Sequence, residues 1–436
     1  MQQRAKLTSE NRTKPDKILV VSNRSLVYDD ANGRSMLMLL KGYKPEDIVN
    51  FYISGKKPDQ NCVFDSMQIT DKQAIRSLLF LKQDQQKVKQ NTLKTTSVDI
   101  PPRKRTSFSS MLRCLVWRFG HWHSCFNNWI SQYHLTYIVL QCGDFPYFFD
   151  FVSSFSKKRK IPLVLYNTEN YYFKRHDYFR RKLRAGLGYR LFHFRLKKSI
   201  SKTIKQSILD VYLTETLLKK YKTEFPEKKA MAIYNSSSIQ PNLNTVNSHC
   251  FLYAGNLANG RLEQLILFSN VLAETDKNYT VKVYGSVAPE EAEKLKQQKN
   301  IVFCGKVSYE TVVSEEKECL AILAINQNTE YAKIDLVDAF STKIPDALNS
   351  GRPLLYFGLK SSAEAEYLIS NECALVAENL VEAKQAITLL TTDNPFVGQI
   401  VKKALMIASK NHNPITNGRR FRSAVENAMK SEKEKC

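Results

Sequence analysis

The sequence predicts an α/β protein built from two doubly wound parallel sheets, and three observations lead to this expectation. Short β-branched runs alternate with segments of helical periodicity along most of the chain. The alternation stops at a polar stretch, residues 240–248, and then starts again. The chain has 436 residues, of which 43% are hydrophobic, and this is enough for two cores.

The first half opens with an expected strand at residues 17–22, whose β-branched run is typical of a strand buried on both faces. A polar loop containing Asp29, Asp30, Asn32 and Gly33 is expected next, followed by a helical stretch at residues 35–40. Further strands are expected at residues 48–54, 137–141, 161–166 and 210–214.

The second half opens with an expected strand and loop at residues 251–257. Several of its strands end at glycine, which lets a ligand approach the backbone at the edge where open α/β sheets bind ligands. Any one of these glycines can be a simple turn residue, but four at equivalent strand ends favour a ligand cleft. The glycines are Gly255, Gly285, Gly305 and Gly358, and the further strands are expected at residues 281–285, 301–305, 320–325, 353–358 and 374–377.

We therefore expect two Rossmann-like domains that face a cleft, at residues 17–240 and 249–395. Residues 1–16 contain no apolar stretch and are expected to be a disordered tail without a signal peptide. Residues 396–436 are expected to form one or two helices that can cross back to the first domain, with a break near residues 411–417.

The charge is distributed unevenly between the halves. The net charge is +23, but residues 1–247 carry +24 and residues 248–436 carry −1. This asymmetry indicates a polyanionic partner for the first half alone. The longest apolar run, residues 319–325, is too short to span a bilayer, and nine scattered cysteines without a CxxC pair indicate reduced cytoplasmic thiols.

One cluster holds residue types that bind metals: Cys114, His121, His123 and Cys125. Their spacing matches none of the usual zinc patterns. In a helix, His121 and His123 would also point to opposite sides. We therefore expect no metal site.

The most informative stretch for chemistry is residues 338–353. Ser341 and Thr342 precede an expected short helix at residues 344–349, and backbone N–H groups at a helix start bind anions. Lys343 adds a positive charge suited to a diphosphate. The alternative is an ordinary capped surface helix.

Two carboxylates flank this turn. Asp346 is suited to accept hydrogen bonds from sugar hydroxyls, and Asp338 is suited to orient a hydroxyl or a ribose. They are separated by seven residues, and a Ser-Gly-Arg-Pro sequence at residues 350–353 follows them.

This stretch resembles the donor-site motif of GT-B-fold glycosyltransferases, especially glycosyltransferase family four, although both acids are Asp where the family usually has Glu. Other segments resemble the family in the same order along most of the chain, and the combination is more specific than any single motif. These are residues 32–34, which resemble the N-terminal glycine loop, the interdomain linker 233–237, the strand and loop 253–261, and the strand and loop 301–307.

The resemblance implies sugar transfer from a nucleotide-sugar, without a metal or another cofactor and mostly with retention of the anomeric configuration. It implies that Lys343 and Arg261 stabilise charge on the leaving diphosphate, with Asp346 beside them. The implied donor-binding residues are Asn32, Gly33, Arg34, Gly255, Asn256, Gly285, Gly305, Lys306, Asp338, Ser341 and Thr342. The acceptor would be a surface polysaccharide or a lipid-linked glycan.

Two carboxylates of the first half are candidates for the acceptor base. Asp144 and Glu169 both follow expected strands, so both should reach the ligand edge of the sheet. The aromatic neighbours of Glu169, among them Tyr166, Tyr171 and Tyr172, suit sugar stacking. An ordinary loop carboxylate paired with Lys174 or Arg175 is an equal alternative for Glu169.

Two segments of the first half combine basic and aromatic residues. An apolar helical stripe runs through residues 108–133, and we expect at least part of it to be core. Residues 174–205 hold twelve Lys or Arg and one acid, which suits a core helix with a solvated face, a membrane surface or a nucleic acid. We favour peripheral attachment to the inner face of an anionic membrane through Arg180, Arg181, Lys182, Arg184, Arg190, Arg195, Lys197 and Lys198.

Two other functions stay open at this point. A related nucleotide-sugar 2-epimerase would use the same fold, but no clear set of cleft histidines and carboxylates supports it. A non-catalytic α/β protein that binds nucleic acid through its basic half is the alternative from a different class.

Overall fold

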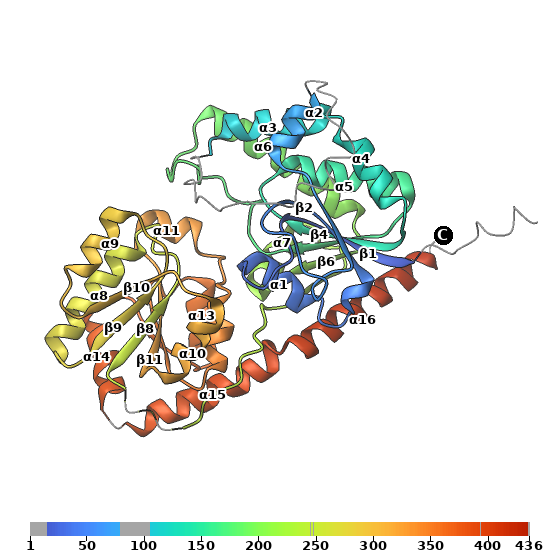
Figure 1. The fold of residues 1–436 in the computed structure, drawn as a ribbon. Coiled ribbons are helices and arrows are strands. Elements are labelled where there is room, and N and C mark those ends of the chain that lie inside the picture. Colours follow the sequence, from blue (N-terminus) through green and yellow to red (C-terminus); the bar gives the residue numbers. More distant parts are fainter. Residues whose placement is uncertain (1–14, 79–104, 245, 247, 393, 435–436) are drawn as a thin grey trace, which may run out of the picture. The chain divides into compact units, whose positions relative to one another are not determined.

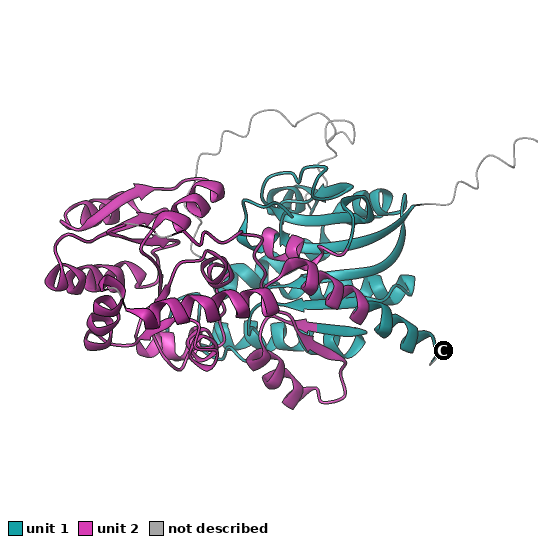
Figure 2. Ribbon diagram, turned by 90° about the horizontal axis from the view of Figure 1, so that it is seen from below, with its two compact units in different colours: residues 1–33, 43–210, 425–436 teal, residues 34–42, 211–424 magenta. Residues whose placement is uncertain are grey.

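The computed structural model describes residues 15–78, 105–244, 246, 248–392 and 394–434, and the chain divides into two compact units (Figure 2). The first unit comprises residues 1–33, 43–210 and 425–436. The second unit comprises residues 34–42 and 211–424. Most of the expected N-terminal tail, residues 1–14, lies outside the described residues.

The first sheet has seven strands in the order β3-β2-β1-β4-β5-β6-β7. Strand β1 (Asp16–Arg24) is central and pairs in parallel with β2 and with β4, and its residues 18–22 are buried. The β-branched run therefore forms a strand covered on both faces, as expected. The other strands are β2 (Ile48–Ser54), β3 (Asp65–Gln68), β4 (His134–Cys142), β5 (Leu163–Asn167), β6 (Leu209–Tyr212) and β7 (Ala230–Ala232).

The segment after β1 differs from the expected loop, because helix α1 (Ala31–Leu39) already begins there. The Asp30 carboxylate accepts hydrogen bonds from the N–H groups of Asn32 and Gly33, both at 3.1 Å. Asp30 thus acts as a helix cap, and Asn32 and Gly33 lie in the first turn of the helix.

The stripe at residues 108–133 is divided between helices α3 (Ser107–Phe119) and α4 (Trp122–Ile130), with Gly120 between them. Trp122, Phe126 and Ile130 of α4 are buried, so this part of the stripe is core. The α3 part is exposed to solvent. The remaining helices of this half are α2 (Asp71–Leu78), α5 (Pro146–Arg159), α6 (Leu187–Gln206), α7 (Glu215–Glu224) and the short 3-10 turn η1 (Pro45–Asp47).

The second sheet has six strands in the order β10-β9-β8-β11-β12-β13, and the strand pairs along it are parallel (Figure 1). Its strands are β8 (Cys250–Ala254), β9 (Thr280–Tyr284), β10 (Ile301–Gly305), β11 (Ala321–Ile325), β12 (Leu354–Phe357) and β13 (Leu375–Ala377). Its helices are α8 (Arg261–Thr275), α9 (Pro289–Lys296), α10 (Tyr309–Glu318), α11 (Glu330–Asp335), α12 (Lys343–Asn349), α13 (Ala363–Ser370) and α14 (Leu380–Thr391). The predicted class, two Rossmann-like parallel α/β sheets, is confirmed.

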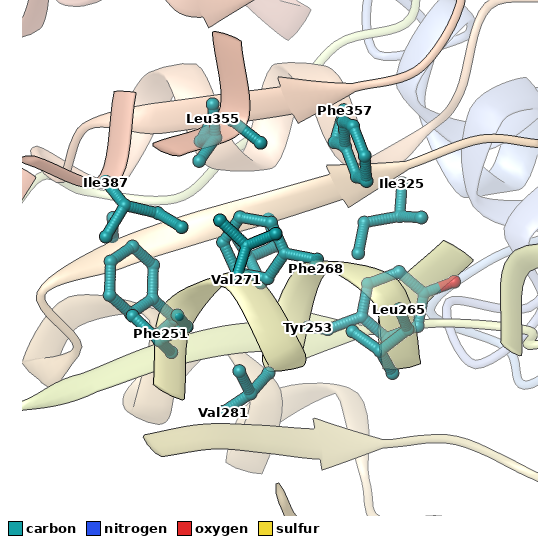
Figure 3. Packing of buried hydrophobic residues seen from close by; sticks show 14 of the residues in the cluster. Phe251, Tyr253, Leu265, Phe268, Val271, Val281, Ile325, Leu355, Phe357 and Ile387 are labelled. Atoms are coloured by element: carbon teal, nitrogen blue, oxygen red, sulfur yellow. The ribbon is translucent and has the colours of Figure 1, made fainter. Parts of the chain in front are cut away.

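One hydrophobic core of the second unit lies between its sheet and helices α8 and α14 (Figure 3), and a second cluster includes residues of α12, α13 and the helix at Pro395–Asn411. Phe251 and Leu355 from the strands meet Phe268 from α8 and Ile387 from α14, and all four are fully buried. Each such side chain contributes roughly 1.5–3 kcal/mol through burial. This core holds the strand ends that form the candidate site.

The chain ends in two long helices, α15 (Pro395–Asn411) and α16 (Pro414–Lys433), on either side of His412 and Asn413. The break thus falls where the sequence places it. None of the helices in the described ranges combines the length and the apolarity that crossing a bilayer requires.

Candidate functional site

A cavity of about 200 Å³ opens at the carboxyl ends of strands β8, β9 and β10 in the second unit. Strand order reverses between β8 and β11, so the cavity lies beside the switch point at which open α/β sheets bind ligands. The residues that line it are Arg34, Ala254, Gly255, Tyr284, Gly285, Lys306, Val307, Tyr309, Val312, Glu316, Lys343 and Asp346. The structure thus brings together six of the predicted site residues: Arg34, Gly255, Gly285, Lys306, Lys343 and Asp346.

The glycines at two strand ends are required by close packing. A Cβ atom on Gly285 would lie 2.1 Å from the carbonyl oxygen of Gly255. A Cβ atom on Gly255 would lie 1.8 Å from Nζ of Lys343. The space that a side chain would take at Gly255 is therefore occupied by the ammonium group of Lys343.

Lys343 is the first residue of α12, and its ammonium group lines the cavity beside the backbone of Gly255. Nζ lies 5.6 Å from the centroid of the Tyr253 ring. Burial, with the nearby Arg261 guanidinium, lowers the pKa of Lys343 to about 8. Within the described part of the chain, Lys343 makes no ion pair. A cation without a counter-ion, placed beside the backbone of a cavity, is suited to bind an anion.

Asp346 occupies another wall of the cavity, on the next turn of α12. Arg34 Nη2 lies 3.6 Å from its carboxylate, and the Arg34 guanidinium stacks 3.9 Å from the centroid of the Tyr309 ring. Burial raises the pKa of Asp346, while Arg34 and hydrogen bonds with Ser237 and Tyr309 act in the opposite direction. The cavity therefore combines a carboxylate with several cations.

Sequence reasoning missed Glu316, the one buried residue of α10. Its Oε2 atom is buried without a hydrogen-bond partner in the described structure. Burial, and then the nearby Asp346, raise its pKa to about 8. The available signal was helical spacing, because Val312 and Glu316 are four residues apart and lie on the same face of the helix.

Glu316→Gln should change the pH dependence of stability. The pKa of Glu316 is raised from its ordinary 4.5 to about 8 in the folded protein, so the folded chain keeps a proton that the unfolded chain releases. Its stabilising contribution is complete below pH 4.5 and is lost as the pH rises towards 8. We expect the melting temperature of the wild type to fall by about 5–10 °C relative to Glu316→Gln between pH 5 and pH 8.5.

The matched control for this measurement is Glu318→Gln, an exposed position on the same helix. Its melting temperature should follow that of the wild type at every pH. If the difference in melting temperature between wild type and Glu316→Gln stays constant from pH 5 to pH 8.5, Glu316 is ionised in both the folded and the unfolded state.

A network of partly buried polar side chains connects Arg261 to Ser341. Arg261 Nε donates to Asn326 Oδ1 at 3.0 Å, and Asn326 Nδ2 donates to Glu364 Oε2 at 2.6 Å. The other oxygen of Glu364 accepts the Ser341 N–H at 2.6 Å. The predicted anion-binding amide of Ser341 is therefore bonded within the protein.

The Lys343 N–H is also hydrogen-bonded within the protein, because it donates to the Ser341 hydroxyl at 3.2 Å. Thr342 is the residue before α12 and makes no side-chain cap. The positive charge that faces the cavity thus comes from the side chains of Arg34, Lys306 and Lys343.

Besides Arg261, Ser341 and Thr342, three more predicted residues of this unit lie outside the cavity lining. Asp338 is buried and forms an ion pair with Lys220. Asn256 shapes its own loop, since its carbonyl accepts from the Tyr253 hydroxyl at 2.9 Å and its side chain accepts from the Ala258 N–H at 2.7 Å. Gly305 has a φ of +72°, which favours glycine for a conformational reason alone.

In the first unit, both candidate bases have partners. Asp144 accepts two hydrogen bonds from Arg105, at 3.1 and 2.6 Å, and one from the Tyr178 hydroxyl at 3.2 Å. Glu169 accepts from Lys174 at 3.4 Å, the pairing that the sequence left open as an alternative. Asp144 or Glu169 could act as a base only after losing these hydrogen bonds.

The aromatic residues near Glu169 are less available for sugar stacking than expected, because Tyr166 and Tyr172 are buried. Asn32 and Gly33 are also held by their own unit. The Asn32 carbonyl accepts from Gln141 Nε2 at 3.0 Å, and a Cβ on Gly33 would lie 2.4 Å from the Ser25 carbonyl oxygen.

The cysteine and histidine cluster has another role in the structure. His123 contacts the Gly120 carbonyl oxygen at 2.8 Å and the Tyr147 hydroxyl at 2.6 Å, so both ring nitrogens have protein partners. Among the residues that the structure describes, no three His, Cys, Asp or Glu side chains are placed to hold a metal ion.

Comparison with solved structures finds the same architecture over nearly the whole chain. HepE from Anabaena, solved in complex with UDP, is 12% identical, with a TM-score of 0.62 over 94% of this chain and 100% of HepE. Sucrose-phosphate synthase from Thermosynechococcus elongatus is 10% identical, with a TM-score of 0.60 over 95% of this chain and 100% of that one. WaaG, a glycosyltransferase involved in lipopolysaccharide biosynthesis, is 13% identical, with a TM-score of 0.55 over 93% and 99%.

At the level of sequence, no family model and no curated protein matches the chain. Identities of 10–13% establish the fold and leave the chemistry to be argued from the site. The two parallel sheets, their strand order and these structural matches together show that the chain has the GT-B glycosyltransferase fold.

Proposed function

We propose that the protein is a glycosyltransferase that moves a hexosyl group from a nucleotide-sugar to an acceptor hydroxyl. The observation that carries the proposal is the cavity at the ends of β8, β9 and β10, where the unpaired Lys343 ammonium lies beside glycine backbone. A diphosphate is the anion that such a site suits. Neighbours of the same fold support this, because HepE structures contain UDP and UDP-glucose.

The chemistry of transfer follows from these charges. Breaking the bond between the sugar and the diphosphate leaves negative charge on the diphosphate oxygens. Lys343 supplies a positive charge held beside the backbone of the cavity, and charges placed where negative charge develops stabilise the transition state. Arg261, fixed by Asn326, adds positive charge close to Lys343.

Asp346 is the carboxylate that we assign to a hydroxyl of the bound donor. It is buried, belongs to the same short helix as Lys343, and is held by Arg34. Glu316, as a neutral acid, adds a hydrogen-bond donor to the same wall of the cavity.

For the acceptor we propose a glycan or a lipid-linked sugar, presented at an anionic membrane surface. The supporting feature is the basic segment predicted from the sequence, in which six side chains are exposed: Arg180, Arg181, Lys182, Arg184, Arg190 and Lys198. The other two residues of the predicted set have partners, since Arg195 pairs with Asp150 and Lys197 lies 4.5 Å from the Tyr172 ring centroid.

A thermal-shift panel tests the donor half of the proposal. Uridine, adenosine, guanosine and cytidine diphosphates and their glucose conjugates are compared with a single-stranded oligonucleotide. At a concentration 100 times its Kd, a true donor stabilises the protein by about 2.7 kcal/mol, which is a shift of several degrees. Stabilisation by the oligonucleotide alone would refute the proposal and support a nucleic-acid-binding module.

The 2-epimerase alternative is separated by product analysis. Proton NMR of the sugar nucleotide after incubation distinguishes the C2 epimer from free or transferred sugar. If the epimer forms and neither hydrolysis nor transfer is detected, the protein is a 2-epimerase and the proposed sugar transfer is refuted.

A further inference from the structure

Helix α3 exposes an apolar face to solvent. Phe108, Leu112, Leu115 and Phe119 follow one another at steps of four, three and four residues, so they lie on a single face. Each is between 51% and 79% exposed. The buried residues of the helix, Ser110 and Trp117, lie on the opposite face, so the apolar stripe faces away from the core.

Helix α6 repeats this arrangement and packs against α3. Leu187, Leu191 and Phe194 follow at steps of four and three, and each is between 58% and 74% exposed. The residues that α6 buries lie on the opposite face: Tyr189, Phe192, Leu196, Ser199, Ile200, Thr203 and Ile204. We call the seven exposed side chains of α3 and α6 the apolar ridge.

Basic side chains flank the ridge on both sides. By helical spacing, Arg190 and Lys197 lie on one side of the α6 stripe and Arg195 and Lys202 lie on the other. Each side opens into a cavity. One, of about 510 Å³, is lined by Arg175, Arg184, Arg190 and Lys197 among others, and one, of about 580 Å³, by Arg118, Lys158, Arg159, Arg195 and Lys202 among others.

Acidic groups around the ridge are few and already paired. Asp150 lines the larger cavity and forms an ion pair with Arg195. Asp177, the single acid of residues 174–205, accepts a hydrogen bond from the Arg180 N–H at 3.1 Å. The surface around the apolar ridge is therefore strongly positive.

We propose that the apolar ridge inserts into the interface of an anionic bilayer, while the two flanking cavities bind lipid phosphate groups. An apolar helix face bordered by Lys and Arg is the surface that lies in the plane of such an interface. Nucleic acid would satisfy the cations, but it would leave the leucines of the ridge in water. The inference rests on the proposed function, in which the acceptor is presented at an anionic membrane surface, and it deepens that proposal by naming the side chains of the first unit that enter the bilayer interface.

Vesicle co-sedimentation of the full chain tests the proposal. Vesicles of phosphatidylcholine alone are compared with vesicles that contain phosphatidylglycerol, at low and high salt. We expect the wild type to bind the anionic vesicles at least tenfold more tightly, with the difference shrinking at high salt because the lipid charge is screened. Equal binding to both kinds of vesicle, or binding to neither, would overturn the proposal.

Ridge variants separate insertion from charge attraction. Leu112→Ser with Leu115→Ser removes the middle of the α3 stripe, and Leu187→Ser with Leu191→Ser removes two of the three residues of the α6 stripe. Because these side chains are exposed, we expect an unchanged melting temperature and a drop in vesicle binding of at least tenfold for each pair. The matched control is Val381→Ser, an equally exposed apolar residue of the second unit, which should bind like the wild type.

The charge variant Arg190→Glu with Lys198→Glu should also lose binding to anionic vesicles. If only this variant loses binding and both ridge pairs bind like the wild type, the contact is electrostatic and insertion is refuted. An oligonucleotide is also tested as a competitor for the vesicles. If it displaces the protein from anionic vesicles and binds both ridge double variants as tightly as the wild type, the surface binds nucleic acid and not a bilayer. Donor stabilisation in the thermal-shift panel is expected to be unaffected in every ridge variant, so the two proposals fail separately.

Discussion

Lys343→Met is expected to reduce kcat/KM for sugar transfer by about 100- to 1,000-fold, the loss seen when one preorganised group that stabilises transition-state charge is removed. The ammonium of Lys343 lies beside Gly255 at the carboxyl end of β8 and makes no ion pair in the described part of the chain. Methionine keeps most of the side-chain volume and removes the charge. Steady-state kinetics with the donor selected by the nucleotide panel provides the measurement.

The same substitution should leave stability unchanged or raise it. Desolvation of the ammonium, together with the nearby Arg261 guanidinium, lowers its pKa to about 8, so the charged form is disfavoured in the protein without donor. We therefore expect the melting temperature of Lys343→Met without donor to equal or exceed that of the wild type. Loss of activity without unfolding separates a role in the chemistry from a structural role.

The matched control is Lys333→Met, on α11 of the same unit, where the lysine is exposed and pairs with Glu330. This variant should retain full activity, because exposed ion pairs contribute little. If Lys343→Met keeps more than half of the wild-type kcat/KM, Lys343 does not stabilise the leaving group.

Asp346→Ala is expected to weaken donor binding by about 10- to 100-fold, the range for losing hydrogen bonds to a charged group. The substitution removes the carboxylate that faces the cavity and leaves Arg34 without its partner at 3.6 Å. Isothermal titration calorimetry with the sugar nucleotide and with the free nucleoside diphosphate measures the loss for each ligand.

Comparing the two ligands shows which hydroxyl Asp346 binds. A loss confined to the sugar nucleotide places Asp346 at the sugar, and an equal loss for both ligands places it at the ribose. Asp276→Ala, in the same unit but outside the cavity lining, should bind both ligands like the wild type. Unchanged binding of both ligands to Asp346→Ala would remove Asp346 from the donor site.

Most of the backbone architecture can be predicted from local sequence patterns, because the strands and helices of this fold have characteristic hydrophobic periodicities. The strand expected at residues 48–54 is β2 (Ile48–Ser54), and two of the four glycines expected at strand ends, Gly255 and Gly285, line the cavity. Strand β3 (Asp65–Gln68) is not predicted from the sequence, because it is polar and only partly buried. Its extended conformation is stabilised by parallel pairing with β2. The predicted helix at residues 35–40 starts later than α1 (Ala31–Leu39), because Asp30 caps the helix instead of belonging to a loop.

Only the tertiary structure decided which side chains are free to act. Asp144 is paired with Arg105, a residue 39 positions away, and the Ser341 amide is bonded to Glu364, 23 positions away. Neither contact can be predicted from the residues that are adjacent in the sequence.

The same holds for the direction in which a helix faces. The stripe through α3 and α4 has one spacing throughout, yet α4 packs it into the core and α3 exposes it. Glu316 is likewise one of several acids on α10, and only packing turns it towards Asp346. The physical reason is that periodicity fixes which residues share a face, whereas contacts between segments remote in sequence decide what that face meets.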